Sequence, residues 1–359
     1  NGLAGPSRDG APLPVSVRPV GSAADLGWTA NAPAVGLALS DALGPVFDQS
    51  GLRFRGLTVD ATSATVRVEN IRYGAQSQAV GRTARILSAV LPGSIETFNI
   101  VLMDRGIPMS RTVVSRTDLE RFEFAPAASN AMRDAVSVLD AADVDRKAGR
   151  PSEDRTFTWA IGPYLSGSLF DPNSPVQLDV GVELDVEWNP TPGLYFNGLM
   201  RQPLLGNLGE SDRFSDSVLP HVRSDTNFYN RADGPILERL TASYFFRPGK
   251  NLYGRVSAGY LERQYGGVST EVLWKPVNSR FALGAELNYA RQRSWDGRFG
   301  FTPNTVVSTD PVTDAGFVSG PRTYDVVTGH VSAYYAFDND FHLQLDVGRY
   351  LAGDVGATL

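Results

Sequence analysis

The side chains of this chain that are best suited to chemistry are carboxylates on one short stretch. Asp179, Glu183 and Glu187 stand four residues apart within the segment PVQLDVGVELDVEW, residues 175–188. Glycoside hydrolases use two carboxyl groups that are held about 5 to 9 Å apart. Several acids on one face of a strand satisfy that spacing by chance, so the spacing alone does not indicate a catalytic pair.

Nucleophilic or metal chemistry would have to use His221, His330 and His342, because the chain has three histidines and no cysteine. A serine hydrolase needs a serine, a histidine and an acid that converge, and no nucleophile-elbow motif accompanies these histidines. The histidines are also too dispersed in the sequence to indicate a metal site. We therefore predict no enzymatic activity, no metal and no cofactor.

The segment that carries the acids alternates between apolar and polar residues. Val176, Val180 and Val182 fall on one parity, whereas Gln177 and Asp179 fall on the other. A strand sends alternate side chains to opposite faces, so one face is apolar and the other is acidic. Two architectures fit this pattern. The apolar face meets a second sheet in a soluble sandwich, or it meets lipid in an outer-membrane barrel.

Composition narrows the function classes without choosing between these architectures. The chain has 359 residues, of which 42% are hydrophobic, and this predicts a folded protein with a large core. A net charge of −6 and the lack of Lys/Arg runs argue against a nucleic-acid partner. No run of about 18 apolar residues indicates a membrane helix, but barrel strands do not require one. The chain starts without Met or an export signal, and we expect it to be a fragment of a longer protein.

The first part of the chain predicts a small α/β module. Residues 1–34 are rich in Gly, Pro and Ala and indicate an extended linker or loop, residues 35–124 form the module, and residues 125–155 are a helical linker. A helix would pack on a sheet of about four strands, and Ser77 would cap the helix near 77–91. The expected helices are 35–49, 77–91 and 130–144, and the expected strands are 52–59, 64–70, 95–103 and 108–115.

From Thr156 to the end, residues 156–359, the pattern becomes strand, turn, strand. Several strands are roughly twice as long as the usual five or six residues of a globular strand. Single-chain bacterial barrels have an even number of strands, and we count nine, so we expect the barrel to continue beyond the fragment. The strands are expected near 156–169, 176–188, 194–201, 236–247, 251–263, 267–275, 280–291, 324–337 and 341–351.

Connection lengths favour the barrel over the sandwich. Successive turns of an up-and-down meander alternate between two ends, which we name end A and end B. The connections near 189–193, 247–251, 276–280 and 338–340 are short and fall at end B, whereas the long connections 202–235 and 292–323 both fall at end A. Outer-membrane barrels show this asymmetry, with short periplasmic turns and long extracellular loops. We therefore predict a transmembrane antiparallel up-and-down β-barrel, preceded by a periplasmic α/β module.

Aromatic residues near end B support the same interpretation. They share the apolar parity and predict a girdle at one membrane interface, although aromatic residues also occur at the ends of ordinary sheets. The girdle candidates are Trp159, Trp188, Phe196, Tyr244, Phe246, Trp274, Phe281, Phe337 and Phe341. The opposite parity predicts a wet interior, in which charges set selectivity or pair to hold the barrel rigid. The lumen-facing candidates are Asp179, Glu183, Asp185, Glu187, Arg255, Glu286, His330, His342 and Asp346.

Charged residues near end A offer two interpretations. Arg223 and Asp225, close to His221, would either hold sugar hydroxyls and uronates or pin the first long loop to the barrel wall. Glu262, Arg263 and Glu271 flank a Gly266-Gly267 pair that predicts a tight turn, and they would form a loop-anchoring cluster of ion pairs. The loop and glycan-contact candidates are His221, Arg223, Asp225, Glu262, Arg263 and Glu271.

Three stretches carry a resemblance to a known family. They are VENIRY (68–73), LPHVRSDTNFY (219–229) and AGYLERQYGGVSTEV (258–272). With them the chain resembles, over roughly residues 35–351, the YjbH family of exopolysaccharide and capsule biosynthesis proteins. The resemblance implies an outer-membrane, lipoprotein-type protein with barrels and periplasmic α/β modules, encoded beside polysaccharide secretion components.

These observations together predict a non-enzymatic outer-membrane β-barrel protein that takes part in secretion or assembly of an exopolysaccharide or capsule. The expected partners are outer-membrane lipid, the extracellular polysaccharide and periplasmic polysaccharide-export proteins, with no nucleic acid. The alternatives are a general porin-like diffusion channel and, less favoured, an outer-membrane barrel hydrolase.

Overall fold

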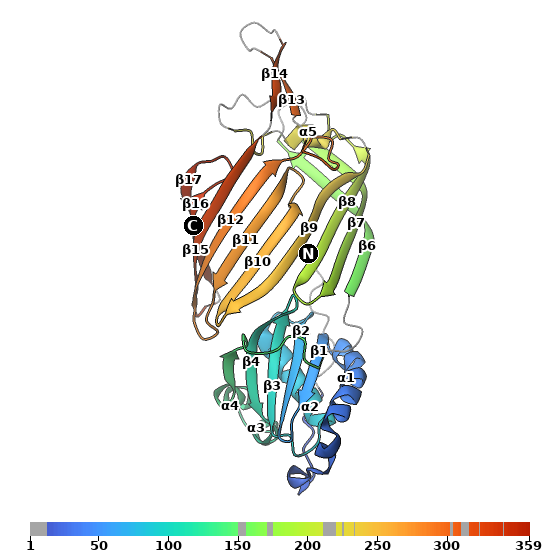
Figure 1. The fold of residues 1–359 in the computed structure, drawn as a ribbon, viewed down its shortest axis with the longest axis vertical. Helices are drawn as coiled ribbons and strands as arrows, with labels where there is room; N and C mark the ends of the chain where they lie inside the picture. The colour runs from blue at the N-terminus through green and yellow to red at the C-terminus, as the bar shows by residue number, and fades with distance from the viewer. Residues whose placement is uncertain are drawn as a thin grey trace. The chain divides into compact units, whose positions relative to one another are not determined.

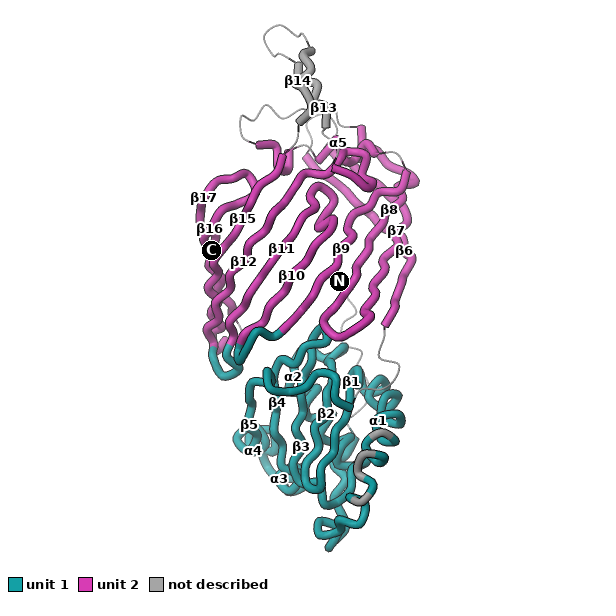
Figure 2. Tube along the Cα trace, in the orientation of Figure 1, with its two compact units in different colours: residues 1–154, 247–251, 276–279 teal, residues 155–246, 252–275, 280–359 magenta. Residues whose placement is uncertain are grey.

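The chain is mainly β and divides into two compact units (Figures 1 and 2). Unit 1 comprises residues 1–154 together with the short segments 247–251 and 276–279, and unit 2 comprises 155–246, 252–275 and 280–359. The computed structural model describes residues 13–149, 156–170, 175–210, 220–224, 226–232, 234–301, 304–309, 316–322, 324–339 and 341–359.

Unit 1 is built on a five-stranded sheet in the order β1-β2-β3-β4-β5. All neighbours are antiparallel except β2 and β3, which are parallel because α2 crosses over between them. The β3–β4 turn is a two-residue hairpin in which Arg105 and Gly106 have positive φ. The strands are β1 (Leu52–Val59), β2 (Ser63–Asn70), β3 (Thr97–Asp104), β4 (Ile107–Ser115) and β5 (Ser137–Asp140). The α-helices are α1 (Ala32–Gln49), α2 (Gln76–Val90), α3 (Arg116–Phe122) and α4 (Ala128–Ala135), and two short 3₁₀ turns, η1 (Ser22–Ala24) and η2 (Gly27–Asn31), precede them.

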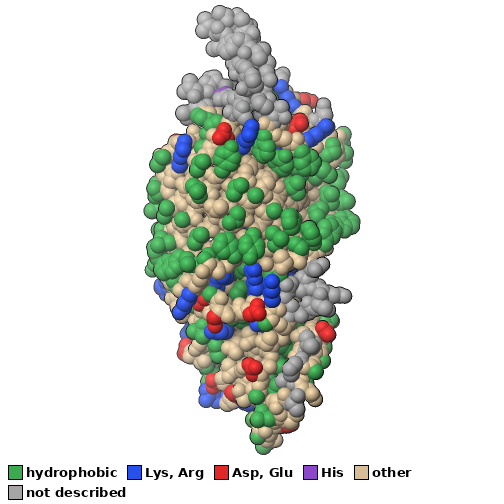
Figure 3. Space-filling view, in the orientation of Figure 1, with side chains coloured by type: hydrophobic (Ala, Val, Ile, Leu, Met, Phe, Trp, Pro, Cys, Tyr) green, Lys and Arg blue, Asp and Glu red, His purple; other side chains and the backbone are tan. Residues whose placement is uncertain are grey.

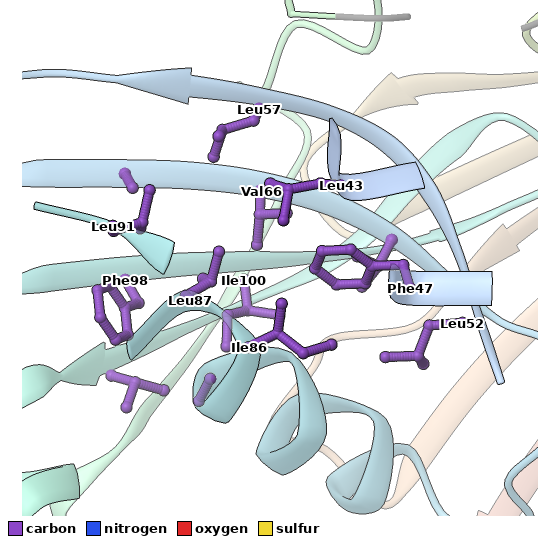
Figure 4. Packing of buried hydrophobic residues seen from close by; sticks show 14 of the residues in the cluster. Leu43, Phe47, Leu52, Leu57, Val66, Ile86, Leu87, Leu91, Phe98 and Ile100 are labelled. Carbon is purple, nitrogen blue, oxygen red and sulfur yellow. The ribbon is translucent and has the colours of Figure 1, made fainter. Parts of the chain in front are cut away.

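The core of unit 1 lies between α1, α2 and one face of this sheet (Figure 4). Phe47 of α1 and Leu87 of α2 are fully buried, and they meet alternate residues of the strands such as Val66 and Ile100. Phe47 packs on Phe54 with ring centroids 5.3 Å apart. The period-2 pattern of the strands and the 3.6-residue pattern of the helices therefore place their apolar side chains in one cluster.

The segment after the module differs from the predicted helical linker. The expected helix 130–144 ends at Ala135, and residues 137–140 form β5, which pairs with the edge strand β4. Val136 is already extended, with φ −88° and ψ 148°. Valines at 136 and 138 favour extended backbone, and pairing satisfies the peptide groups of an exposed edge. The predicted capping role of Ser77 is also wrong, because Ala75 is the N-cap of α2 and no side chain caps it.

Unit 2 is a ten-stranded antiparallel meander, in the order β17-β16-β15-β12-β11-β10-β9-β8-β7-β6. A separate hairpin of β13 (Asn304–Thr309) and β14 (Gly316–Arg322) lies in the connection from β12 to β15, and α5 (Thr226–Asn230) lies in the connection from β8 to β9. The sheet strands are β6 (Thr156–Leu169), β7 (Val176–Thr191), β8 (Leu194–Gly206), β9 (Ile236–Gly249), β10 (Leu252–Tyr260), β11 (Tyr265–Trp274), β12 (Phe281–Gln292), β15 (Asp325–Ala336), β16 (His342–Arg349) and β17 (Val355–Thr358).

The nine predicted strands of this sheet are all present, and three features differ from the prediction. β17 is an additional strand, and the hairpin β13–β14 lies where only a loop was expected. Gly266 and Gly267 lie inside β11 rather than in a turn. A Cβ at Gly267 would lie 1.9 Å from the carbonyl oxygen of Tyr289, so glycine here allows close approach of two strand backbones. Among the described helices, none has the length and apolar character needed to cross a membrane.

Glu96 joins the N-terminal segment of unit 1 to the end of β4. Its carboxylate accepts hydrogen bonds from Arg18 Nη2 at 2.6 Å, Ser115 Oγ at 2.9 Å and the Thr117 N–H at 3.0 Å. Burial by itself raises the pKa of this carboxyl, but the hydrogen bonds from Thr117, Arg18 and Ser115 outweigh burial. The pKa of Glu96 therefore lies below its ordinary value of 4.5.

The lowered pKa of Glu96 makes the stability of unit 1 depend on pH. A carboxyl with a lower pKa in the folded state stabilises that state above pH 4.5, and the contribution is lost as the pH falls through the folded-state pKa. We expect Glu96→Gln to lower the melting temperature at pH 7. Below pH 4.5, the melting temperature of this variant should fall less steeply with pH than that of the unchanged chain. Circular dichroism of the helices measures both effects. The exposed Asp41→Asn is the control, and equal acid slopes for Glu96→Gln and the unchanged chain would contradict this account.

Candidate functional site

The sheet of unit 2 has its polarity reversed relative to a water-soluble sheet. On β7 the side chains of Val176, Leu178 and Val180 are exposed, whereas Gln177 and Asp179 between them are buried. The same alternation continues on β12, where Phe281 and Leu283 are exposed and their small neighbours are buried. Strand geometry therefore collects the apolar side chains on one face, which we name the apolar face, and the polar ones on the other, the polar face.

The apolar face extends across all ten strands. Hydrophobic side chains cover the side of unit 2 that is seen in Figure 3, and charged side chains gather toward its margin. The largest exposed apolar patch of a typical monomer is about 300–600 Å². At about 4.8 Å between strands, ten strands make a surface roughly 45 Å wide. Exposed members from β6 to β16 include Ile161, Leu165, Val182, Met200, Leu240, Val256, Val268, Val272, Leu287, Val331, Leu343, Leu345 and Val347.

The aromatic residues predicted as a girdle lie on the apolar face near end B. Trp188 is in register with Phe157 on one side and Phe196 on the other, and its ring stacks on Phe196 at 5.2 Å. The row continues through stacked and edge-on pairs on the later strands. These pairs are Tyr244–Phe246, Trp274–Phe281 and Tyr335–Phe337, with ring centroids 5.8, 6.5 and 4.8 Å apart. Trp159 and Phe341 are exposed on the same side of the sheet.

The polar face carries its charges in cross-strand partnerships. Arg255, Glu271, Glu286 and His330 follow one another in register across four strands. Arg255 Nη2 lies 2.9 Å from Glu271 Oε2, and His330 Nδ1 lies 2.8 Å from Glu286 Oε1. Glu183 is bound by Arg201 at 3.1 Å. These pairs lower the cost of placing charges on a partly buried surface.

The other predicted lumen residues differ in their contacts and exposure. Asp346 accepts a hydrogen bond from Ser332 at 2.5 Å and two from the Gln344 amide. Asp185 and His342 are exposed, and Glu187 is half-buried. Within the described ranges, no three histidine, aspartate or glutamate side chains gather as metal ligands would.

A cluster of buried residues packs at end A, and Arg293 is its centre. We name this the A-end loop cluster, comprising residues 222–224, 226–232, 260–265 and 291–301. Arg293 is fully buried, with 0% of its surface exposed. Its guanidinium donates to the carbonyl oxygens of Leu237, Glu262 and Arg298 at 2.7, 2.8 and 2.9 Å, and lies over the Tyr260 ring at 4.5 Å. One side chain thus joins β9, the β10–β11 turn and the segment after β12.

Helix α5 is held in the same cluster. The Tyr229 hydroxyl donates to the Arg293 carbonyl oxygen at 2.8 Å, and Arg263 Nη2 donates to the Tyr229 carbonyl oxygen at 2.7 Å. Phe228 stacks on Trp295 with centroids 4.2 Å apart. The two long connections of end A are therefore packed on each other.

The predicted loop residues are divided between two places. Arg223 forms a two-pronged ion pair with Glu262, at 2.5 and 3.0 Å, and lies over the Tyr265 ring. Arg263 lies 3.7 Å from Glu238, whereas Glu271 pairs with Arg255 on the sheet and is not part of the loop cluster. His221 is half-buried, and Asp225 lies outside the described residues. Arg293, Tyr229 and Trp295 were missed, because a lone arginine or aromatic residue in a long connection gives no periodic signal.

The fold and these surfaces define a class of mainly β protein whose sheet exposes an apolar face, keeps its polar face inward and packs its long connections at one end. A family model, YjbH, described as "Exopolysaccharide biosynthesis protein YbjH", matches residues 4–359. The chain belongs to this family, which confirms the resemblance found in the sequence.

A curated relative, "Uncharacterized lipoprotein YjbH" of Escherichia coli (strain K12), is 29% identical over 300 residues. These residues make up 81% of this chain and 40% of that protein, so the chain spans about two fifths of the relative's length. No solved structure matches the chain.

Replacement of Arg293 tests whether it holds the loop cluster together. Arg293→Met keeps much of the side-chain volume but leaves three carbonyl oxygens without their charged donor, and each such bond is worth about 1.5–3 kcal/mol. We expect faster proteolysis within residues 222–232 and 291–301 and a lower melting temperature. Arg239→Met, at an exposed arginine on β9, is the control. Unchanged proteolysis of Arg293→Met would show that the cluster does not depend on this residue.

Proposed function

We propose that unit 2 crosses the bacterial outer membrane as a β-barrel wall and serves secretion or assembly of an exopolysaccharide without catalysing a reaction. One observation carries the membrane assignment, namely that the apolar side chains of the sheet are exposed and the polar ones buried. Each Å² of apolar surface left in water costs about 25 cal/mol. A surface that includes every strand of the sheet would be strongly destabilising in water and is stabilising against lipid.

The dimensions of the strands support this proposal. β6 and β9 have 14 residues each and β12 has 12. Twelve residues at about 3.3 Å each extend roughly 40 Å, and a tilt of about 40° reduces this to about 30 Å along the membrane normal. The hydrocarbon core of a bilayer is about 30 Å thick. The aromatic row near end B then lies at one interface, where tryptophan and tyrosine rings are favoured.

The outer edge of β6 needs a pairing partner if the sheet lies in a membrane. Among the described strands, β6 pairs only with β7, so its outer peptide groups have no strand beside them. The β6 side chains Trp159 and Ile161 are 61% and 62% exposed, against 37% for Val182 of β7 and 40% for Leu283 of β12. Unpaired peptide groups are very costly in hydrocarbon. The proposal therefore includes a further strand against β6 that completes the wall.

The polysaccharide assignment rests on the family. The chain belongs to a family described by exopolysaccharide biosynthesis, and the Escherichia coli relative is named a lipoprotein. The proposal places unit 1 in the periplasm, because residues 13–149 precede β6, which starts at end B. There the module would contact periplasmic polysaccharide-export proteins, and the long connections of end A would face the outside and the polysaccharide.

Single cysteines test the proposed lipid face directly, because the chain has none of its own. In intact cells, we expect Val180→Cys and Val182→Cys to resist a charged, water-soluble maleimide, since their side chains would face hydrocarbon, which the reagent does not enter and in which the thiol stays protonated. Glu210→Cys in the first long connection should react with the charged reagent from outside. Labelling after denaturation gives the total thiol for every variant.

The opposite labelling result is equally informative. If Val180→Cys and Val182→Cys react with the charged reagent as fast as Glu210→Cys, the apolar face is in water and the membrane assignment is wrong. If they resist it in a chain that is recovered in the soluble fraction and not with the outer membrane, another protein surface covers them, as in a sandwich.

A further inference from the structure

Aromatic side chains from the connection after β12 fold back over the apolar face at end A. The Phe301 ring stacks on Tyr260 of β10 with ring centroids 5.4 Å apart, and Phe299 meets Tyr260 edge-on at 6.0 Å. Tyr260 continues the parity of the exposed Val256. A Cβ at Gly266 of β11 would lie 2.7 Å from Phe301 Cζ, so the Phe301 ring covers this glycine. Because Phe299 is 72% exposed, end A has an exposed aromatic surface of its own.

Arg291 is the last apolar-parity residue of β12 and lies beside these rings. It follows Leu287 and Tyr289, which are 59% and 43% exposed, on the same face of the strand. Its guanidinium carbon lies 5.7 Å from the centre of the Phe301 ring. Its Nε is buried without a hydrogen-bond partner, and no ion pair among the described residues includes it. This guanidinium can therefore bind an anion from outside the chain.

Charges on the apolar parity of the neighbouring strands also lie at end A. Asp325 of β15 is exposed and in register with Arg291, but no ion pair among the described residues joins them. On β16 the same parity ends in Arg349, whose Nε donates to the Gly353 carbonyl oxygen at 3.2 Å. The rest of this parity on β12, β15 and β16 is uncharged. A lipid-facing arginine is costly at the middle of a bilayer and tolerated near its interfaces, so these charges indicate an interface.

The separation between Arg291 and the end-B aromatic row agrees with the height of a barrel's apolar band. Phe281 of that row and Arg291 lie on the same face of β12. Ten residues at about 3.3 Å each, tilted by about 40°, extend about 25 Å along the membrane normal. The apolar band of outer-membrane barrels is about 25 Å tall, with aromatic residues at both interfaces. The membrane assignment thus places Arg291 at the depth of the headgroups.

The buried Arg293 holds the aromatic group in place. Its guanidinium lies over the Tyr260 ring at 4.5 Å, and the same guanidinium donates to three carbonyl oxygens of the A-end loop cluster. Tyr260 in turn supports Phe301 and Phe299. A surface that is already ordered loses little conformational freedom when a ligand binds.

We name Tyr260, Tyr289, Arg291, Phe299 and Phe301 the end-A belt. We infer that the end-A belt binds the phosphate-bearing headgroup of an outer-leaflet glycolipid, an inference that rests on the proposed membrane assignment. Arg291 donates paired N–H bonds to the phosphate oxygens, a geometry that guanidinium groups favour. Phe299 and Tyr289 contact the sugar and the first carbons of the acyl chains, as aromatic residues do at membrane interfaces. The carboxylate of Asp325 opposes the phosphate and limits its affinity.

Native mass spectrometry of the full chain in detergent micelles tests this inference. The probes are lipid A with its two phosphate groups, the same lipid A with both phosphates removed, and inorganic phosphate. We expect the phosphorylated lipid to bind about tenfold more tightly than the dephosphorylated one, the ratio expected for one charged hydrogen bond. Inorganic phosphate at the same concentration should not displace it. Equal affinity of the two lipids, displacement by inorganic phosphate, or binding of neither lipid would each overturn the inference.

Matched variants assign the binding to the end-A belt. Arg291→Gln should weaken binding of phosphorylated lipid A about tenfold and leave the dephosphorylated lipid unaffected. Phe299→Ser should weaken binding of both lipids. Arg239→Gln, at an exposed arginine of β9, is the control and should change neither affinity. An equal loss in Arg239→Gln and Arg291→Gln would show a general charge effect and no lipid site.

Asp325→Asn separates a lipid contact from an internal ion pair. If Arg291 binds the phosphate, removal of the opposing charge strengthens binding of phosphorylated lipid A. Weaker binding by Asp325→Asn would show that Arg291 serves to hold Asp325, which contradicts the inference.

The labelling of Val180→Cys and Val182→Cys distinguishes failure of this inference from failure of the proposed function. If these cysteines resist the charged reagent while Arg291→Gln binds both lipids as the unchanged chain does, the lipid site is wrong and the membrane assignment stands. If they react as residues in water do, the membrane assignment fails and the end-A belt fails with it.

Discussion

The central constraint on this protein is the solvent that its large sheet requires. Valine, leucine and aromatic side chains point outward from strands β6 to β16, and serine, threonine and charged side chains point the other way. A sheet of this kind is stable only if an apolar medium covers the outward side. Strand length, turn length and the aromatic row near end B are consistent with one medium, a bilayer. The membrane assignment therefore explains several features that have no common cause in water.

The polar face shows how the polar side chains of this sheet contact one another. Arg255, Glu271, Glu286 and His330 form a row across four strands, in which Arg255 pairs with Glu271 and His330 contacts Glu286. Ser243 and Ser257 share a hydrogen bond of 2.8 Å on the same face. At end A a single buried arginine, Arg293, binds three carbonyl oxygens and holds the two long connections together. The paired charges on the strands and the buried Arg293 in the loops thus both satisfy polar groups inside the protein.

Sequence periodicity was sufficient for the strands and insufficient for the loops. The alternation of residues 176–188 predicted β7 and which of its side chains share a face, because a strand has one simple period. The loop cluster depends on contacts between residues far apart in the chain, such as Tyr229 with Arg293, and no local period encodes them. The helix predicted over 130–144 is shorter in the structure for a related reason. β4 offers an unpaired edge, and the residues that follow the helix pair with this edge as β5.

Quenching of tryptophan fluorescence by brominated lipids tests the central claim most directly. Variants that keep only Trp188, only Trp274 or only Trp28 would be reconstituted into bilayers with bromines at known depths along the acyl chain. The account predicts that Trp188 and Trp274 are quenched most strongly by bromines near the interface and to the same extent, because both lie at the end-B side of the apolar face. Trp28, in unit 1, should not be quenched. No quenching of Trp188 and Trp274 by any brominated lipid would contradict the account.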